Sequence, residues 1–313
     1  MPGCDYSFIT PSYRNDYAIA RHLCESMDAF VQGRFEHILV VPRRDLKLFR
    51  DLESAHRRLL TVESVVGQRG FIRVPFPTRI GLGGVTLYAG RELWFHPHAG
   101  LMTGWSLQQI VKLSAPDYAQ AEVLVYVDSD VEFFRKFDPR SLSQDGLLKL
   151  HKHTRGATRE THQAWRLAAK QLLHLAEGCD ADAVNYIGNI VPWTKSNLVS
   201  LQQRLTQANG RVWWIALAQR RFFSEYILYG MFCEKHLGAA SNSLPLDIGL
   251  YNSIWNKDEY LRNHGFVEEM KASHVALHIQ STSKIDPQTR RKIVADAIAQ
   301  YRESELAGAP PQG

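Results

Sequence analysis

Cysteine is scarce in this chain, with four residues among 313 and no pair at the spacing of a metal site. This pattern predicts reduced, structural cysteines in a cytosolic protein, and spacing alone leaves a disulfide open. Long apolar runs are also missing: the longest, residues 212–218, is far too short to span a bilayer. The amino-terminal residues lack the charged region, apolar segment and cleavage site of a signal peptide. We therefore expect a cytoplasmic protein without a transmembrane segment.

A strong excess of charge of one sign is absent as well. The net charge of +5 and the pI near 9.0 are modest for this length, and they fall short of the dense basic clustering of nucleic-acid-binding proteins. We expect no nucleic-acid partner, whereas a phosphate-bearing substrate fits the small positive excess. The basic interval Lys149–Lys170 indicates a solvated face; an acidic glycan, a lipid diphosphate or an anionic membrane surface are the alternatives.

What the chain does contain is an ordinary globular composition and an α/β pattern. Hydrophobic residues make up 45% and charged residues 22%, which is enough to bury a sizeable core. Residues 6–10 and 37–41 form short apolar strands, and apolar residues recur at helical spacing over residues 20–31 between them. Strand, helix and strand within this distance make a parallel βαβ unit, which is almost always right-handed.

Further elements follow from the same patterns. The predicted helices are 43–52, 104–113, 159–175, 195–207, 220–235 and a last one that begins at Asp286-Pro287. The weaker strand predictions are 59–66, 71–74 and 184–191, and residues 75–104 are expected to form loops or a small hairpin because they are rich in Gly and Pro. The sequence thus predicts an α/β fold with a mostly parallel central sheet flanked by helices, in a single domain.

The segment Glu122-Val-Leu-Val-Tyr-Val-Asp-Ser-Asp130 carries the strongest functional signal. Its residues 123–127 are typical of a strand covered on both faces. Asp128 and Asp130 follow at its carboxyl end, where open α/β sheets place their ligands. Two carboxylates there predict a site for a hard divalent cation that bridges phosphate oxygens. The same Asp-x-Asp spacing recurs at Asp180–Asp182 without a strand before it, so the strand distinguishes the first copy.

The order of the motifs resembles that of the GT-A glycosyltransferases, which use nucleotide-sugar donors. Ile9-Thr-Pro-Ser-Tyr-Arg-Asn-Asp16 looks like the first strand and nucleotide loop of that superfamily, and Asp128-Ser-Asp130 like its metal-binding acidic motif. Phe223-Ser-Glu225 opens a helical segment in the region where the superfamily often places a catalytic acid. His278 resembles the histidine that completes the metal site. The order of these short motifs carries more weight than any one of them.

A closer resemblance comes from three further segments. Gly104-Trp-Ser-Leu-Gln-Gln, Tyr126-Val-Asp-Ser-Asp and Ser224-Glu-Tyr-x-Leu-Tyr-Gly230 are similar to a poorly characterised bacterial family of proposed glycosyltransferases. The resemblance implies a metal-dependent enzyme that moves a sugar from a nucleoside-diphosphate sugar to a hydroxyl of a glycan or lipid-linked acceptor. Synthesis of bacterial surface polysaccharide or glycoconjugates is the implied setting, in the cytoplasm or peripherally at the inner membrane face.

The same resemblance divides the chain. It implies one GT-A-like catalytic domain over residues 1–304, with a donor half at 1–130 and an acceptor half with closing helices at 131–304. Residues 305–313, which include Gly308-Ala-Pro-Pro-Gln-Gly313, are expected to form a disordered tail.

Roles for individual residues follow from the resemblance. Asp130 is expected to be the most direct ligand of Mn²⁺ or Mg²⁺, with Asp128 contacting the ribose or reaching the metal through water. His278 would complete the coordination sphere of the metal, and an imidazole ligand favours Mn²⁺. The alternative is that His278 is a hydrogen-bonded core residue, and His274 is the competing candidate for the ligand. Glu225 is the candidate general base. The alternative role for Glu225 is a surface ion pair with Arg220 or Arg221, and the alternative residue for the base is Asp247. The remaining donor-binding predictions are Thr10, Tyr13, Arg14, Asp45, Gly188 and Lys284.

These donor contacts have plain alternatives. A Tyr13 face suits a base and an Arg14 guanidinium suits phosphate, but both also fit an ordinary surface loop. Gly188 would allow close backbone approach to the donor sugar, or form a strand bulge. Trp105 and Lys112 are predicted to be structural parts of the helix behind the metal strand.

Three other functions remain in view. A phosphohydrolase of the haloacid-dehalogenase type also has Asp-x-Asp after an apolar strand, but Asp128 lies far inside the chain and no Asp-Asp dipeptide follows. A sugar-nucleotide pyrophosphorylase would need a glycine-rich basic loop where Pro11-Ser-Tyr-Arg14 stands. A catalytically silent binding module is the third alternative.

Overall fold

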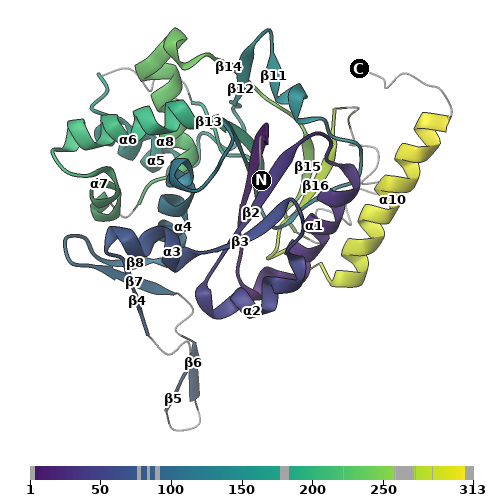
Figure 1. Cartoon of the computed structure of the whole chain (residues 1–313), viewed down its shortest axis with the longest axis horizontal. Helices are drawn as coiled ribbons and strands as arrows, with labels where there is room; N and C mark the ends of the chain where they lie inside the picture. Colours follow the sequence, from purple (N-terminus) through teal and green to yellow (C-terminus); the bar gives the residue numbers. More distant parts are fainter. Residues whose placement is uncertain are drawn as a thin grey trace.

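The computed structural model describes residues 4–75, 79–82, 85–88, 92–176, 183–220, 222–256, 258, 271, 273–283 and 285–306. A five-stranded sheet forms its centre, in the order β13-β9-β1-β2-β3 (Figure 1). The strands are β1 (Tyr6–Pro11), β2 (Phe35–Val41), β3 (Arg57–Thr61), β9 (Val123–Val127) and β13 (Ile190–Thr194). All neighbours are parallel except β13, which runs antiparallel to β9 at the edge. The prediction of a mostly parallel central sheet is confirmed.

Alternation of side chains along the strands decides what covers each face of the sheet. Ile9, Leu124 and Tyr126 point into the larger core, which they share with α4 and four further helices. These helices are α4 (Gly104–Leu113), α5 (Glu160–Leu173), α6 (Lys195–Asn209), α7 (Trp213–Arg220) and α8 (Glu225–Met231). Phe8 and Val125 point to the opposite face, where α1 (Tyr17–Phe30) packs and completes the predicted βαβ unit.

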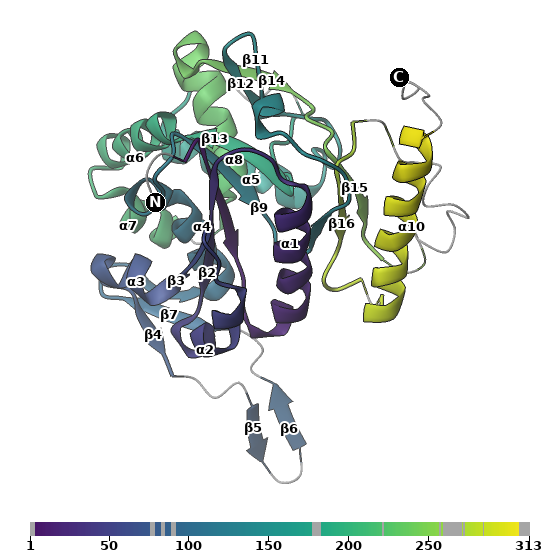
Figure 2. The ribbon, with the colours of Figure 1, turned by 45° about the vertical axis from the view of Figure 1, so that its right-hand side comes forward.

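A second sheet extends the structure beyond α1 (Figure 2). It contains β10 (Val131–Phe133), β16 (Ala276–Ile279) and β15 (Tyr251–Ile254), in that order. α10 (Pro287–Leu306) packs on it through Ile293, Val294 and Ala297. The predicted cap is confirmed, because Oδ1 of Asp286 accepts a hydrogen bond from the Thr289 N–H at 2.9 Å. α10 runs two residues into the predicted tail, and the rest of that tail lies outside the described residues.

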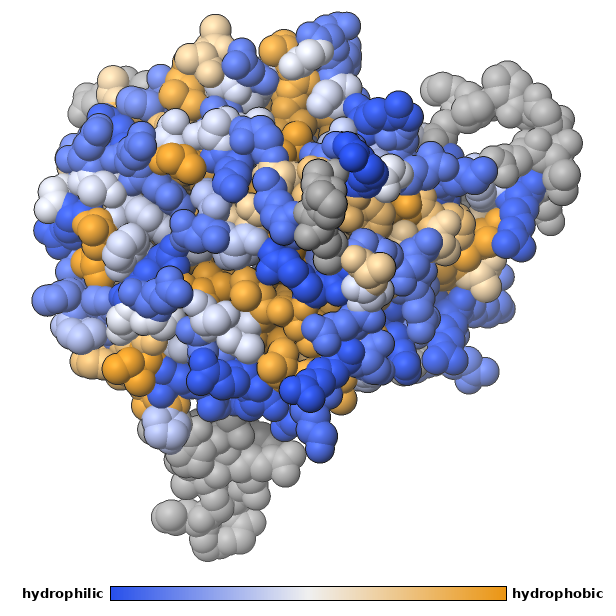
Figure 3. All heavy atoms as spheres, in the orientation of Figure 1, coloured by the Kyte–Doolittle hydropathy of each residue, from blue (hydrophilic) through white to orange (hydrophobic). Residues whose placement is uncertain are grey.

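The smaller elements surround this framework. They are α2 (Leu46–Phe49), α3 (Val62–Val66), β4 (Ile72–Val74), β7 (Leu93–His96), β8 (Gly100–Thr103), β11 (Ser143–Gln144), β12 (Leu147–His151), β14 (Ser243–Leu246) and the hairpin of β5 (Arg79–Leu82) and β6 (Val85–Tyr88). On the face shown in Figure 3, polar side chains alternate with small apolar patches.

None of the described helices combines the length and the apolar character that a membrane crossing requires.

Three predicted elements differ from the structure. The strand predicted at 59–66 stops at Thr61, whose hydroxyl accepts a hydrogen bond from the Ser64 N–H and starts α3. The helix predicted at 220–235 begins only at Glu225, after Ser224 as its cap, and continues as a π-helix over Phe232–Leu237. The strand predicted at 184–191 begins only at Ile190.

Candidate active site

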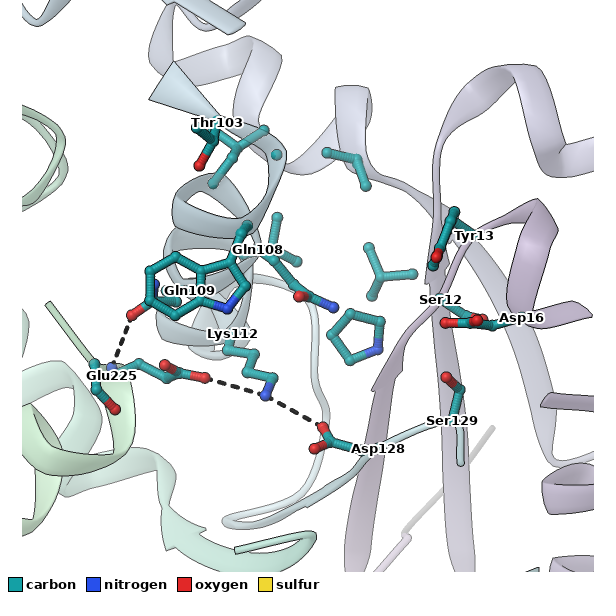
Figure 4. Close-up of a pocket in the computed structure, with 18 of the residues that line it drawn as sticks. Ser12, Tyr13, Asp16, Thr103, Gln108, Gln109, Lys112, Asp128, Ser129 and Glu225 are labelled. Atoms are coloured by element: carbon teal, nitrogen blue, oxygen red, sulfur yellow. Dashed lines mark hydrogen bonds and ion pairs between the residues drawn. The ribbon is translucent and has the colours of Figure 1, made fainter. Parts of the chain in front are cut away.

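A cavity of about 840 Å³ opens at the carboxyl ends of β1 and β9, the edge where open α/β sheets hold their ligands (Figure 4). Its volume lies in the upper part of the range of small-molecule sites, roughly 300–1,000 Å³. The lining residues come from the loop after β1, from α4, from the loop after β9, and from the beginning of α8 and the end of β16. Segments far apart in the sequence therefore share one concave surface.

Asp130 and His278 are brought together by the second sheet. Val131 pairs with His278 in the antiparallel register of β10 and β16, and this register places Nε2 of His278 3.5 Å from Oδ2 of Asp130. The same carboxylate oxygen accepts a hydrogen bond from the Ser281 N–H at 3.0 Å. Burial alone would raise the pKa of Asp130, but the His278 ring, the Ser281 N–H and Arg290 together lower it below its ordinary value.

Asp128 is turned toward a different partner. Its Oδ1 lies 3.4 Å from Nζ of Lys112, which is also 3.1 Å from Oε1 of Glu225. Lys112 further donates to the Tyr226 hydroxyl at 2.8 Å. Burial opposes its charge, but Asp128, Tyr226 and Glu225 outweigh it and raise the pKa of Lys112 well above its ordinary value. Lys112 is a buried part of α4, as predicted, and it also lines the cavity as a cation.

Glu225 lies at the first position of α8 and is 5% exposed. Its backbone N–H donates to Oε1 of Gln109 at 3.1 Å, which links α8 to α4. Its carboxylate pairs with Lys112 and not with Arg220, whose guanidinium donates to Gln171. Arg221 lies outside the described residues. Asp247, the alternative acid, is paired with Arg155 at 3.0 Å and does not line the cavity.

The loop after β1 contributes Ser12, Tyr13 and Asp16 to the cavity. Tyr13 is 43% exposed, so much of its side chain is accessible to a ligand. Burial, and then the nearby charge of Asp130, raise the pKa of Asp16 to about 6. Asp16 and Ser12 were missed at the sequence level, although both belong to the segment that resembles the nucleotide loop.

Other predicted donor contacts lie outside the lining. Thr10 is buried and donates to the Val127 carbonyl at 2.8 Å, so it ties β1 to β9. Arg14 pairs with the buried Asp45 at 3.1 Å, and its backbone N–H donates to the same carboxylate. A Cβ at Gly188 would stand 2.7 Å from the His151 ring, so this glycine makes room for a side chain. Lys284 falls outside the described residues.

The predicted three-residue metal set is only partly assembled. Within the part of the chain that the structure describes, no three His, Cys, Asp or Glu side chains converge in a metal-binding arrangement. Asp130 and His278 form a pair, and Asp128 faces Lys112 instead. A carboxylate and an imidazole nevertheless suit Mn²⁺, and a cation that arrives with a diphosphate needs few protein ligands, because phosphate oxygens and water supply the rest.

Two tryptophans on the cavity wall were not predicted as site residues. Trp105 is 48% exposed, which corrects its assignment as a purely structural residue, and Trp165 stacks on it with 5.8 Å between ring centroids. Trp193, by contrast, is buried in the core and stacks on Tyr229 with 4.2 Å between ring centroids.

Comparison with known families places the chain. The family described as "Family of unknown function (DUF6492)" matches residues 8–304. The chain belongs to this family. A search among curated proteins found no match for the DUF6492 chain.

Among the solved structures that resemble the DUF6492 chain are glycosyltransferases of low identity. The galactosyltransferase LgtC, in complex with donor and acceptor sugar analogs, is 12% identical, with 93% of this chain and 95% of that chain covered and a TM-score of 0.46. Mouse xyloside xylosyltransferase 1 is 12% identical, with 90% and 100% covered and a TM-score of 0.43. The bifunctional WbbM is 10% identical, with 89% and 46% covered and a TM-score of 0.46. At this distance the activity has to be inferred from the residues of the cavity.

Proposed function

We propose that the DUF6492 chain is a glycosyltransferase that moves a sugar from a nucleoside-diphosphate donor to an acceptor hydroxyl. One observation carries the proposal: a single cavity unites the loop after β1, the acidic pair after β9 and the carboxylate at the start of α8. A donor site, a site for the charge of the leaving group and a candidate base thereby face one another.

The donor is proposed to bind on the side of Tyr13 and Asp16. The exposed side chain of Tyr13 suits stacking on a nucleobase. The hydroxyl of Ser12 lies beside it in the lining, has no hydrogen-bond partner within the described part of the chain, and offers a hydrogen bond to a ribose or phosphate oxygen. Thr10, Arg14 and Asp45 would support this loop from behind without touching the donor.

The charge of the cavity favours a donor that is accompanied by a cation. Five carboxylates line the cavity, and Lys112 is the one lysine or arginine among the described lining residues. Glu92 is balanced by Arg73 at 2.5 Å, and Lys112 is shared by Asp128 and Glu225. A diphosphate would add negative charge to this set, which is electrostatically unfavourable without a compensating ion.

We propose that Asp130 and His278 hold Mn²⁺ or Mg²⁺. Such a cation would supply Lewis acidity to the phosphate of the leaving group. Asp130 suits the task because its lowered pKa keeps it ionised at neutral pH. The contact of Nδ1 of His278 with the Ser253 hydroxyl at 3.2 Å would orient the ring, with Nε2 toward Asp130.

Glu225 is the proposed base for an inverting transfer. It would accept the proton of the acceptor hydroxyl as that oxygen attacks the anomeric carbon. Lys112 would act as a positioning residue: it fixes the Glu225 carboxylate from one side and holds Asp128 from the other. In this assignment the donor contacts Tyr13 and Asp16 come from the half at 1–130, and Glu225 comes from the half at 131–304.

The test is a thermal-shift panel of UDP, GDP, TDP and CMP, each with and without Mn²⁺. A nucleotide at 100 times its Kd should stabilise the protein by roughly 2.7 kcal/mol. Asp130→Asn should abolish the part of the shift that needs Mn²⁺. Asp51→Asn, which removes an exposed acid in an ion pair with Arg21, is the matched control and should keep it. Absence of stabilisation by every nucleotide would contradict the proposal.

A further inference from the structure

Three aromatic rings form an open surface at one end of the cavity. Trp105 and Trp165 line the cavity, and Phe222 lies against Trp165 with 5.7 Å between centroids. Trp105 and Phe222 are 48% and 47% exposed, and the Trp105 and Trp165 rings are inclined by only 26°. Large aromatic rings that stack on one another and stay partly exposed beside a cavity are typical of a binding surface. We call these three residues the aromatic platform.

The aromatic platform lies on the Glu225 side of the cavity. Phe222 stands three residues before Glu225, and α5, which carries Trp165, packs against α8. Tyr13 and Asp16 lie on the opposite side of Lys112 and Asp128 (Figure 4). The proposed donor contacts therefore leave the aromatic platform free, and they leave it beside the candidate base.

A free hydrogen-bond donor adjoins this side. Gln109 is 2% exposed and lines the cavity. Its Oε1 accepts the Glu225 N–H, which identifies the other atom of the amide as Nε2. Among the described residues, Nε2 has no hydrogen-bond partner although it is buried. An unpartnered buried amide is unfavourable, and a ligand hydroxyl would satisfy it.

We propose that the aromatic platform and Gln109 form the acceptor subsite and that the acceptor is a neutral sugar. A pyranose has an apolar C–H face, which suits the ring faces, and hydroxyls at its edge, which suit the Gln109 amide. An anionic acceptor fits less well, because Asp128 and Glu225 stand next to the subsite and Lys112 is already shared between them. This inference rests on the proposed transferase for its chemistry.

The test uses ligand-observed NMR on the full chain with lactose, maltose, cellobiose and diacetylchitobiose as probes. At least one should bind, and Trp105→Ala should weaken it roughly tenfold, with partial recovery in Trp105→Phe. Phe95→Ala, which removes a ring of similar exposure that does not line the cavity, should bind as the wild type does. The thermal shift with nucleotide and Mn²⁺ should persist in Trp105→Ala.

Four outcomes would overturn the inference. The first is that no saccharide binds, and the second is that wild type and Trp105→Ala bind saccharide equally. The third is that Trp105→Ala loses nucleotide binding but keeps saccharide binding. The fourth is that the protein binds anionic vesicles instead of saccharide and that this binding depends on Trp105. The third would assign the aromatic platform to the donor base and the fourth to a membrane surface. Saccharide binding that depends on Trp105 without any nucleotide binding would refute the transferase and leave the subsite standing.

Discussion

Removal of the buried cation should destabilise the protein strongly. Lys112 is 5% exposed and lies 3.4 Å from Asp128, 3.1 Å from Glu225 and 2.8 Å from the Tyr226 hydroxyl. Lys112→Met keeps most of the side-chain volume but leaves two carboxylates facing each other with no positive charge between them. Breaking a buried ion pair in this way costs roughly 3–5 kcal/mol. That is a large share of the roughly 5–15 kcal/mol by which domains are stable.

Urea denaturation followed by circular dichroism measures this loss, with Lys152→Met as the control. Lys152 lies 2.9 Å from Glu234, but its side chain is 27% exposed, and Glu234 keeps Lys235 at 3.0 Å as a second partner. The same change of charge should therefore cost at most about 1 kcal/mol there. The double variant Lys112→Met/Glu225→Gln removes the repulsion together with the cation and should regain more than half of the loss.

The deficit of Lys112→Met should also depend on pH. The two facing carboxylates of the variant would bind protons more readily in the folded than in the unfolded state. The stability that this protonation provides is present at low pH and is lost as the pH rises through the folded-state pKa. The loss of unfolding free energy relative to wild type should therefore shrink toward about pH 4 and grow toward pH 7. The reasoning fails if Lys112→Met costs no more than Lys152→Met, or if its deficit is the same across this range.

Two further variants test single residues of the site. The pKa of Asp16 is raised to about 6. Protonation of Asp16 therefore stabilises the folded state in full at a pH below its ordinary pKa, and this stabilisation is lost as the pH rises through about 6. Asp16→Asn should therefore raise the unfolding free energy at neutral pH by on the order of 1–2 kcal/mol, and a gain that persists at low pH would refute the assignment. Gly188→Ala would place a Cβ 2.7 Å from the His151 ring and 2.9 Å from Val191, which should cost roughly 1–3 kcal/mol in urea denaturation and leave the nucleotide shift intact. If Gly188→Ala instead lost the thermal shift with nucleotide while its stability stayed unchanged, the result would support the donor contact predicted for Gly188.

The elements that local patterns specify were predictable from the sequence. β1, β2 and β9 are short apolar runs buried on both faces, and the helical spacing between the first two strands left little choice but a parallel βαβ unit. The position of Asp128 and Asp130 at the end of β9 followed directly from that strand. Their motif order also led to His278, and the antiparallel pairing of Val131 with His278 provides the physical reason for its proximity to Asp130.

The partners of buried charges were not predictable in the same way. The helical spacing of α4 places Lys112 on a buried face, but only packing against β9 and α8 shows that this face meets Asp128 and Glu225. Thr10 failed as a cavity residue because side chains alternate along a strand, and its hydroxyl points back to the Val127 carbonyl. The exposure of Trp105 likewise depends on how α5 and the Phe222 segment approach α4, which no local pattern records.

The cavity has two parts in which the removal of a charged side chain should have opposite effects on stability. Around Lys112 a cation is already present, so its removal should destabilise the protein. Near Asp130, burial and then the charge of Asp130 raise the pKa of Asp16, so removal of the Asp16 carboxylate should stabilise the protein, and added Mn²⁺ should do the same. If Lys112→Met and Asp16→Asn shifted stability in the same direction at neutral pH, one continuous charge network would span the cavity. The division into a donor side that recruits a cation and an acceptor side that carries its own would then be wrong.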